Sequence, residues 1–308
     1  MEYKVVKPLF KYIGGKTWLR TKLREKVSKV LSNKEIKYYV EPFAGGLGSF
    51  LSVYDVLLTN NISNVVLGDI NSNLINLYKH INSHTEELIE DTILLEKGFS
   101  KTISVPSDTK HTKEELKDAE TYYKEIRNSF NINKKEDTPL QSARLIFLQK
   151  HSFNGVYREN SKGDYNTPFN WSPSSMEKTI GDRILELAEV FSSFNMNFII
   201  GSYEKHKYTK DSLFYLDPPY LNEKELIENQ YNQAGFTLAN QLELIDKIKD
   251  TNFIYSNHNS IILTDVLSKI NEIEIECINR KNIMSASVST RADDKQELLA
   301  TYINLTFD

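Results

Sequence analysis

The sequence holds a single cysteine, Cys277, in a chain of 308 residues. One cysteine excludes a disulfide bond within the chain and any cysteine-rich zinc site. No cluster of cysteine, histidine and acidic residues has the spacing of metal ligands, so we predict no metal centre. His151 and His258 are expected to satisfy local hydrogen bonds instead. Cys277 falls in an alternating stretch and is expected to be a small core residue.

Long hydrophobic runs are also missing. No segment approaches the ~18 consecutive apolar residues that a membrane helix needs, and the opening stretch MEYKVVKPLFKYIGG lacks the apolar core of a signal peptide. We therefore expect a cytoplasmic protein with no membrane contact. With 40% hydrophobic and 26% charged residues, the chain is of ordinary globular composition, and its length suggests one large domain or two of moderate size.

An overall excess of positive charge, the usual mark of a nucleic-acid-binding protein, is absent. The net charge is −4 and the isoelectric point is about 6.0. Residues 1–30 nevertheless contain nine lysines and arginines against two glutamates. Such a local basic face can bind phosphates even when the total charge is negative, because salt screens distant charges. It could equally be a solvated helix face, and the composition leaves both interpretations open.

Strands and helices alternate at the start of the chain. Ile36 to Val40 has the pattern of a buried strand that runs into a glycine-rich turn, and residues 48–58 have the apolar spacing of a helix. A second strand ends at Asp69 and is followed by a second helical pattern at residues 73–81. This alternation predicts an α/β fold with a doubly wound, Rossmann-like sheet.

The alternation stops for about a hundred residues, a length that is unusual for a simple connection. From about Glu86 to Phe194 the patterns are helical or irregular, and strands resume in NFIIGSY, SLFYLDPPY, NFIYSN, EIEIECINR and ELLATYINLTF. The simplest interpretation is one sheet with a mostly helical insertion between its second and third strands. We predict one domain from residues 1–80 and 196–308, and an inserted domain from residues 81–195.

The predicted strand at residues 213–216 ends in Asp217, Pro218, Pro219 and Tyr220. Two prolines end a strand and leave carbonyls without competing N–H donors. An amine conjugated to a ring, such as N6 of adenine, is a poor nucleophile because its lone pair is delocalised. Asp217 and the Pro218 carbonyl could each accept one amino hydrogen and stabilise the charge that develops on attack. Tyr220 offers a ring on which an unstacked base can lie.

A glycine-rich turn, EPFAGGLG, follows the first predicted strand. It is not a dinucleotide fingerprint, because the order G-x-G-x-x-G would need glycine where Leu51 stands. That departure argues against a dehydrogenase. The acid, the phenylalanine and the glycines instead resemble motif I of S-adenosylmethionine-dependent methyltransferases. Asp69, at the end of the second strand, is suitably placed to bind ribose hydroxyls.

Taken in order along the chain, these motifs resemble the DNA adenine-N6 methyltransferases, the Dam-like or alpha-group family. The resemblance covers nearly the whole length, with FKYIGGK, EPFAGG, LGDIN and YLDPPYL as cofactor and catalytic motifs and SNH with RKNIMSASVSTRADDKQELLA as the C-terminal signature. It implies methyl transfer from S-adenosylmethionine to N6 of a flipped adenine in duplex DNA. Residues 1–80 and 196–308 would then be the catalytic domain.

The resemblance also assigns roles to individual residues. The implied catalytic residues are Asp217, Pro218 and Tyr220. The implied cofactor contacts are Tyr12, Lys16, Glu41, Phe43, Gly45, Gly48, Asp69 and Asp217.

By the same resemblance, the insertion is a target recognition domain. YYKEIRNSFN and FNGVYRENSKGDYNTP look like its helix and its β-hairpin, with a tip at residues 161–164. A two-stranded ribbon fits the major groove, where Arg158 could donate two hydrogen bonds to guanine. The implied target is GATC or a related short site, although Phe153, Val156 and Trp171 depart from the residues that the family prefers. The implied DNA contacts are Lys11, Phe153, Asn154, Val156, Arg158 and Pro168.

Two alternatives stay open at this stage. The amine could be N4 of cytosine or lie in RNA, although alpha-group cytosine enzymes more often carry serine in place of Asp217. The chain could also be a catalytically silent DNA-binding subunit, but a mere binder would not need Asp217, Gly45, Gly48 and Asp69 together. We expect a monomer that binds double-stranded DNA, with a cognate restriction endonuclease as a candidate partner.

Overall fold

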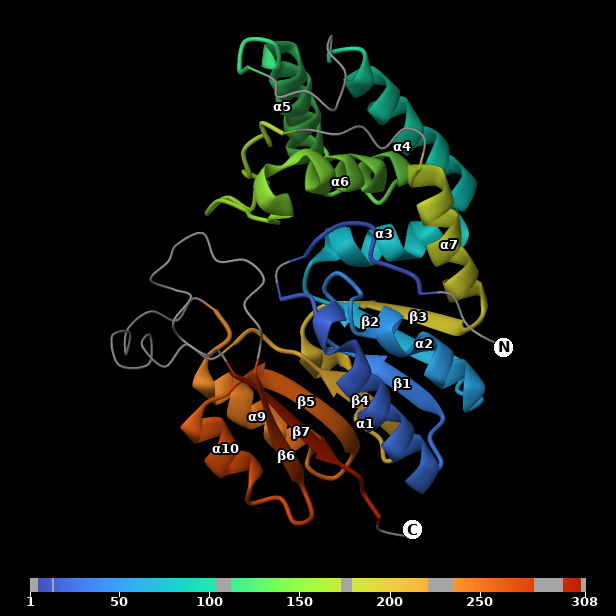
Figure 1. The fold of residues 1–308 in the computed structure, drawn as a ribbon, viewed down its shortest axis with the longest axis vertical. Helices are drawn as coiled ribbons and strands as arrows, with labels where there is room; N and C mark the ends of the chain where they lie inside the picture. The colour runs from blue at the N-terminus through green and yellow to red at the C-terminus, as the bar shows by residue number, and fades with distance from the viewer. Residues whose placement is uncertain are drawn as a thin grey trace.

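The computed structural model describes residues 5–12, 14–103, 112–172, 179–220, 235–279 and 296–305. Its centre is a seven-stranded sheet, in the lower half of Figure 1. Across the sheet the strands follow the order β3-β2-β1-β4-β5-β7-β6. In chain order they are β1 (Tyr38–Glu41), β2 (Asn64–Asp69), β3 (Asn195–Ile200), β4 (Ser212–Leu216), β5 (Asn252–His258), β6 (Glu274–Asn279) and β7 (Gln296–Tyr302).

Strands β1 to β5 form the parallel part of the sheet. β1 pairs with β2 and β4, β2 pairs with β3, and β4 pairs with β5, whereas β7 runs antiparallel to both β5 and β6. The predicted doubly wound α/β sheet is confirmed, with an antiparallel pair at its C-terminal edge. The first strand is Tyr38–Glu41 instead of the predicted Ile36–Val40, so Glu41 belongs to the strand.

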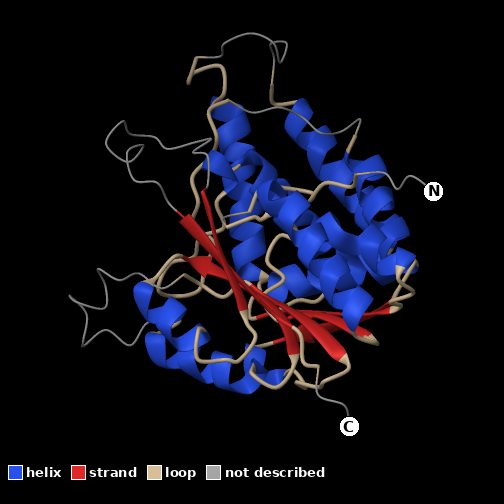
Figure 2. Ribbon diagram, turned by 60° about the horizontal axis from the view of Figure 1, so that its bottom comes forward, coloured by secondary structure: helices blue, strands red, loops and turns tan. Residues whose placement is uncertain are grey.

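Helices cover both faces of the sheet (Figure 2). α1 (Arg20–Asn33), α2 (Phe50–Thr59) and α3 (Ser72–Ser83) share a core with one face, and α9 (Leu238–Ile248) and α10 (Ile261–Leu267) share a core with the other. Along β4, Leu213 and Tyr215 belong to the first core, whereas Phe214 and Leu216 belong to the second. Because side chains alternate along a strand, burial on both faces requires such a continuous apolar run.

Beyond α3, the described residues between β2 and β3 form four further α-helices, which stand above the sheet in Figure 1: α4 (Thr85–Ser100), α5 (Lys117–Ile132), α6 (Pro139–His151) and α7 (Ile180–Ser192). Aromatic rings fill the space between them, among them Phe99, Phe147 and Phe169. The boundaries at residues 81 and 195 stay a prediction, because α3 and α7 contact each other across them. In the described part of the chain, no helix combines the length and apolarity needed to cross a bilayer.

The helical region also buries one of the histidines singled out from the sequence. Nε2 of His151 lies 2.8 Å from Oε1 of Glu96, and both side chains are buried. The predicted local hydrogen bond is therefore confirmed for His151.

The basic residues of α1 are largely paired with acids of the sheet. Lys26 is 1% exposed and forms ion pairs with Glu274 and Glu276 of β6, and Lys29 lies 2.7 Å from Glu274. The pKa of the Glu274 carboxyl falls to about 2 because Lys29 and Lys26 donate to it. For these lysines, the basic face predicted from composition serves to dock α1 against β6.

The prediction for Cys277 is wrong. Its side chain is exposed on β6, which is an edge strand and pairs with β7 alone. An edge strand lacks a neighbour on one side, and an alternating pattern does not distinguish it from a central strand.

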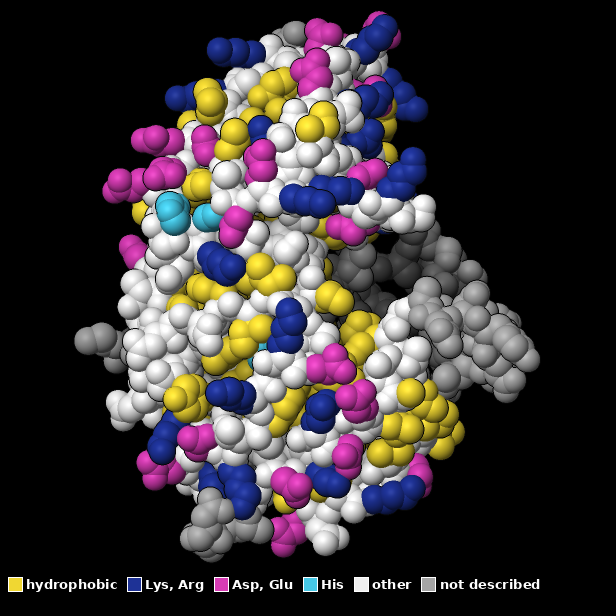
Figure 3. Space-filling view, turned by 180° about the vertical axis from the view of Figure 1, so that it is seen from behind, with side chains coloured by type: hydrophobic (Ala, Val, Ile, Leu, Met, Phe, Trp, Pro, Cys, Tyr) yellow, Lys and Arg dark blue, Asp and Glu magenta, His cyan; other side chains and the backbone are white. Residues whose placement is uncertain are grey.

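The face seen from behind mixes both signs of charge (Figure 3). Lysine and arginine side chains are interspersed with acidic ones, and apolar side chains gather over α9 and α10, where Leu242, Ile261 and Ile262 are exposed. The residues described on this side of the molecule therefore form no extended basic surface for nucleic acid.

Gly68 of β2 provides a test of the packing beneath the parallel strands. A Cβ atom on Gly68 would overlap the ring of His206, which is buried. We expect Gly68→Ala to destabilise the fold by ~1–3 kcal/mol, because a close-packed core absorbs extra atoms poorly. The double variant Gly68→Ala/His206→Ala should regain part of this loss.

Gly181→Ala is the matched control, because its Cβ would make only an ordinary contact of 3.4 Å with Ile89. The measurement is the midpoint of thermal unfolding of the wild type, Gly68→Ala, the double variant and Gly181→Ala. Equal midpoints for Gly68→Ala and the wild type would contradict the packing described.

Candidate active site

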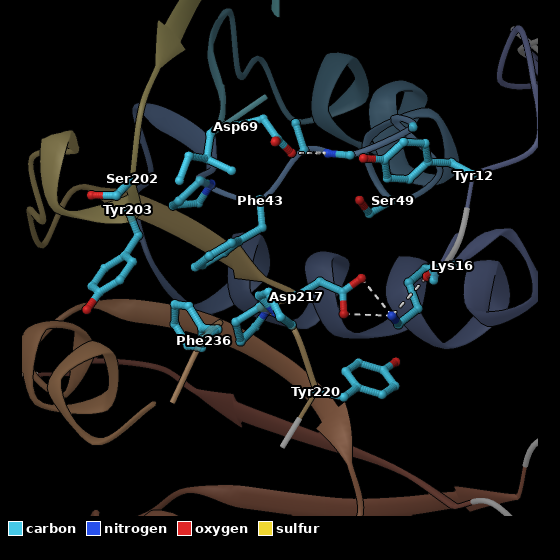
Figure 4. Close-up of a pocket in the computed structure, with 18 of the residues that line it drawn as sticks. Tyr12, Lys16, Phe43, Ser49, Asp69, Ser202, Tyr203, Asp217, Tyr220 and Phe236 are labelled. Carbon is cyan, nitrogen blue, oxygen red and sulfur yellow. Dashed lines mark hydrogen bonds and ion pairs between the residues drawn. The ribbon is translucent and has the colours of Figure 1, made fainter. Parts of the chain in front are cut away.

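A cavity of about 940 Å³ opens at the carboxyl ends of β1, β2 and β4. The strand order reverses there, since β1 has β2 on one side and β4 on the other, and such a switch point is where open α/β sheets bind ligands. Figure 4 shows side chains from separate segments around this space. Of the residues predicted from the sequence, the cavity is lined by Tyr12, Lys16, Phe43, Gly45, Gly48, Asp69, Asp217, Pro218 and Tyr220.

Asp217 stands where β4 ends. Both of its carboxylate oxygens accept a hydrogen bond of 2.6 Å from Nζ of Lys16, which is 2% exposed (Figure 4). The sequence assigned Lys16 to the cofactor, whereas its ammonium group here contacts the predicted catalytic carboxylate. The segment before α1 therefore closes one side of the cavity.

The carbonyls of the two prolines have different surroundings. The Pro219 carbonyl accepts a hydrogen bond of 2.8 Å from Nε2 of Gln241, which fixes the turn against α9. Within the described residues, the Pro218 carbonyl has no such donor, and Pro218 lines the cavity. The turn is thus held by one carbonyl while the other stays available as an acceptor.

The electrostatic environment sets the charge of Asp217. Burial raises the pKa of its carboxyl to about 6, the Lys16 ammonium opposes that rise, and the Glu297 carboxylate adds to it. Asp217 is therefore ionised at neutral pH and can accept hydrogen bonds, and it becomes protonated only as the pH falls through about 6.

Glu297 of β7 is a member of the site that the sequence did not reveal. It is 3% exposed, and both of its oxygens accept from the Tyr220 hydroxyl, at 2.6 and 2.9 Å. Nζ of Lys16 lies 3.6 Å from the same carboxylate and 4.8 Å from the centre of the Tyr220 ring. A single acid at the start of the apolar run ELLATY was the one available indication of this role.

The opposite end of the cavity is built on the glycine turn. Oδ2 of Asp69 accepts a hydrogen bond of 2.9 Å from the Gly45 N–H, and Oδ1 accepts one of 2.9 Å from the Asn71 N–H. Burial raises the pKa of the Asp69 carboxyl, although these backbone donors oppose the rise. A Cβ on Gly46 would come within 2.5 Å of the Tyr12 Cβ, so glycine is what lets the N-terminal segment cross the turn.

Glu41 does not line the cavity. It is fully buried and accepts hydrogen bonds of 2.5 Å from Tyr39 and 2.8 Å from Ser49. Burial raises the pKa of its carboxyl to about 8, so it carries a proton at neutral pH. Its contact with the cavity runs through Ser49, which is a lining residue.

An aromatic wall borders the cavity, and of its three rings the sequence predicted only Phe43. Phe43 stacks on Tyr203 at 5.9 Å between ring centres and meets Phe236 edge-on at 5.7 Å. Ile70, next to Asp69, is 79% exposed. These apolar surfaces lie beside the carboxylate of Asp69, an arrangement that suits a ligand with both a flat ring and hydroxyl groups.

The predicted recognition segment reverses direction near residues 161–164, but not as a continuous ribbon. It has two isolated antiparallel bridges, Ser152 to Phe169 and Glu159 to Tyr165, so the prediction of a regular two-stranded hairpin is corrected to an irregular one. The bridge positions Ser152, Tyr165 and Phe169 are buried. These anchors tie the irregular hairpin to the helices.

The predicted DNA contacts lie on the outer side of this hairpin. Phe153, Asn154, Arg158 and Pro168 are exposed, and Val156 is half-buried. Asn154 has φ of 57°, in the left-handed region that asparagine adopts more readily than most residues other than glycine.

Two further contacts orient the predicted DNA-reading groups. Nε of Arg158 donates to Oδ1 of Asn166 at 2.7 Å, and one terminal nitrogen donates to the Asn166 carbonyl at 3.2 Å. Lys11 lies beside Gly155, since a Cβ atom added to Gly155 would be 3.5 Å from the Cβ of Lys11. The structure thus brings Lys11 to the base of the hairpin that carries Arg158.

Comparison with known proteins accounts for this combination of sheet, cavity and insertion. The family described as D12 class N6 adenine-specific DNA methyltransferase matches residues 12–281, which include the glycine turn, the insertion and Asp217. The chain belongs to this family. It is a site-specific, adenine-specific DNA methyltransferase of the D12 class.

Two type II methyltransferases are similar to the D12-class enzyme over nearly the whole of both chains. The type II methyltransferase M.MjaIII of Methanocaldococcus jannaschii is 30% identical over 96% of this chain and 98% of its own length. The type II methyltransferase M1.LlaDCHI of Lactococcus lactis subsp. cremoris is 27% identical over 97% and 96%. The DNA adenine methylase of Haemophilus influenzae is 27% identical over 82% and 80%.

Membership of the D12 class decides between the alternatives left open by the sequence. The family is specific for adenine and for DNA, so cytosine N4 and RNA are set aside, and the chain is an enzyme and not a silent binding subunit.

The ion pair between Lys16 and Asp217 gives the D12-class enzyme a testable pH dependence. Methyl transfer that needs an ionised Asp217 should fall as the pH drops through about 6. Lys16→Met removes the positive charge that favours ionisation, so we expect the midpoint of this acidic limb to move to higher pH. The measurement is the single-turnover rate against pH at saturating substrates.

Lys29→Met serves as the control, because Lys29 pairs with Glu274 on the far side of α1 and does not line the cavity. Its acidic limb should match that of the wild type. An unmoved limb in Lys16→Met would show that the ion pair does not set the charge of Asp217.

Proposed function

We propose that this enzyme transfers the methyl group of S-adenosylmethionine to N6 of an adenine flipped out of duplex DNA, within GATC or a related short site. The observation that carries the proposal is the end of β4. There a buried strand presents an ionised carboxylate, an available Pro218 carbonyl and the 39% exposed ring of Tyr220 to one cavity.

The lining of the cavity has two chemically different ends, of which one suits the cofactor and the other the target base. Pockets for one small ligand measure roughly 300–1,000 Å³, and this one, at about 940 Å³, lies at the top of that range. Asp69 would accept from ribose hydroxyls, and Ile70 and Phe43 would contact the purine of the cofactor. S-adenosylmethionine supplies an electrophilic methyl group on a sulfonium centre, and the Asp217 end is left for the target base.

At that end, the residues of the chain act on the amine. The Asp217 carboxylate and the Pro218 carbonyl would accept the two N6 hydrogens, which aims the nitrogen lone pair away from both acceptors. Lys16 occupies the same carboxylate oxygens, so its ammonium group must shift or share them when the amine arrives. A carboxyl with a pKa of about 6 can also hold the proton that the amine releases.

The hairpin is the proposed reader of the target. Asn166 uses two donors of Arg158 and fixes its plane, which leaves other guanidinium N–H groups for a guanine edge. Val156 and Pro168 are apolar and suit a thymine methyl group. Lys11 would contact the guanine at the other end of the site, and Phe153, 52% exposed, would stack in the space left by the flipped base.

The same proposal covers the organisation of the enzyme. Residues 1–80 and 196–308 would perform catalysis, and residues 81–195 would recognise the target. The names of two relatives, type II methyltransferases, support a cognate restriction endonuclease as a partner. We propose that the enzyme acts on DNA in the cytoplasm as a monomer.

The central test is methyl transfer by Asp217→Ala and Asp217→Asn. Loss of a group that stabilises developing charge costs ~10²-fold or more in rate, so both variants should fall at least that far while DNA binding survives. The assay follows labelled methyl groups from S-adenosylmethionine into plasmid DNA. Either variant with more than about a tenth of the wild-type rate would refute the role of Asp217.

Recognition is tested by Arg158→Ala and its matched control Arg158→Lys. If Arg158 contacts a guanine edge, each change should cost ~1–3 kcal/mol, or about 5- to 150-fold, at one base pair of the site. Lysine keeps the charge and the phosphate attraction but loses the fork geometry, so it should relax specificity as alanine does with less loss of DNA affinity. Single-molecule sequencing of methylated plasmid reads the outcome. Modified adenines scattered outside any GATC-like context in the wild type would refute the proposed target.

A further inference from the structure

Glu297 is a buried acid whose partners all belong to the catalytic end of the cavity or support it. A carboxylate removed from water is stable only if donors replace the lost hydration. Here the donors are the Tyr220 hydroxyl at 2.6 Å, the Ser256 hydroxyl at 2.5 Å, and the Lys16 ammonium at 3.6 Å. Neither the family match nor the sequence motifs assign this carboxylate a role.

The sheet fixes where this carboxylate lies. β7 runs antiparallel to β5 with Glu297 opposite His258 and Leu299 opposite Ser256, so the two side chains that bond, Glu297 and Ser256, are diagonal neighbours. Ser256 is fully buried, and it anchors the acid from below. A side chain held by two strands gives a more rigid attachment point than one on a loop.

Tyr220 is the first group that depends on this attachment. Its ring is 39% exposed, and its hydroxyl is bonded to both oxygens of Glu297. An exposed ring without such a bond samples several rotamers, and a base that stacks on it must then order the ring as well. The bond to Glu297 keeps the ring in place before the base arrives.

Lys16 is the second dependent group. Its ammonium lies 2.6 Å from Asp217, 3.6 Å from Glu297 and 4.8 Å from the Tyr220 ring centre. One cation is thus shared between two carboxylates. Lys16 lowers the pKa of Asp217 and Glu297 raises it, whereas the charge of Asp217 contributes to the raised pKa values of Glu41, Tyr215 and Tyr255.

We propose that Glu297 is a positioning residue for methyl transfer, which holds the Tyr220 ring and the Lys16 ammonium in place beside Asp217. This role rests on the proposed function of Asp217 and Tyr220. Glu297 itself acts through those two side chains and does not contact the base.

The experiment is a double-mutant cycle on the full-length enzyme. Glu297→Gln keeps the shape and removes the charge, and Tyr220→Phe keeps the ring and removes the hydroxyl. We expect each single variant to lower the single-turnover rate about 10-fold or more at saturating cofactor and DNA, since each loses a charge-assisted hydrogen bond. The double variant should be no slower than the slower single variant, because both changes remove the same contact.

A pH profile distinguishes positioning from a merely structural role. Glu297→Gln removes a negative charge near Asp217, so its acidic limb should move to lower pH, opposite to the shift expected for Lys16→Met. Glu276→Gln is the matched control. Glu276 lies on the neighbouring strand β6, pairs with the buried Lys26 of α1 and does not line the cavity. This variant should lower thermal stability and leave rate and pH limb unchanged.

The outcomes separate this inference from the proposed function. The positioning role would be overturned by a folded Glu297→Gln with the wild-type rate and acidic limb. It would also be overturned if the rate losses of the two single variants simply multiplied in the double variant. In either case, an inactive Asp217→Asn would still support the catalytic assignment. An active Asp217→Asn would instead refute the catalytic assignment itself. If Glu297→Gln does not fold, Tyr220→Phe decides alone, and a wild-type rate there would overturn the inference.

Discussion

The negative charge of a carboxylate at the end of a strand buried on both faces needs a positive partner, and for Asp217 that partner is the ammonium group of Lys16. The two residues are 201 positions apart, so the ion pair requires the segment before α1 to lie across the mouth of the sheet. That path brings Tyr12 against Gly46 and the backbone of Lys16 against Gly48, where a Cβ would come within 3.2 Å of its nitrogen. The glycine turn therefore makes room for the protein's own N-terminal segment as well as for a ligand.

Local patterns predicted the parts of the site that are contiguous in sequence. The run LFYL followed by Asp-Pro-Pro-Tyr identified β4 and its polar end, and the glycine turn with Asp69 identified the other end of the cavity. Strand and helix alternation identified the class of fold. These features succeed because each is one short segment whose chemistry and periodicity are visible without a partner.

The contributions that the sequence did not reveal come from long-range packing. Tyr203 and Phe236 line the cavity from the connections between elements, while Glu297 of β7 and Gln241 of α9 contact its lining residues Tyr220 and Pro219. Their sequence neighbours give little sign of these roles. Cys277 was misplaced for the same reason, since an alternating strand does not state whether it lies at an edge. Composition did not decide whether the lysines of α1 form a phosphate-binding face or a solvated one, because their counter-charges lie on the distant strand β6.

The position of β7 in the sheet has a consequence for biosynthesis. Among the described strands, β7, which carries Glu297, comes last in chain order yet lies between β5 and β6, so the sheet can close only after this segment has been made. A nascent or prematurely terminated chain can bury much of its core and still lack the carboxylate that contacts Lys16 and Tyr220. The chemical centre of an enzyme that marks DNA is thus assembled only when the three distant segments that carry Lys16, Asp217 and Glu297 have met.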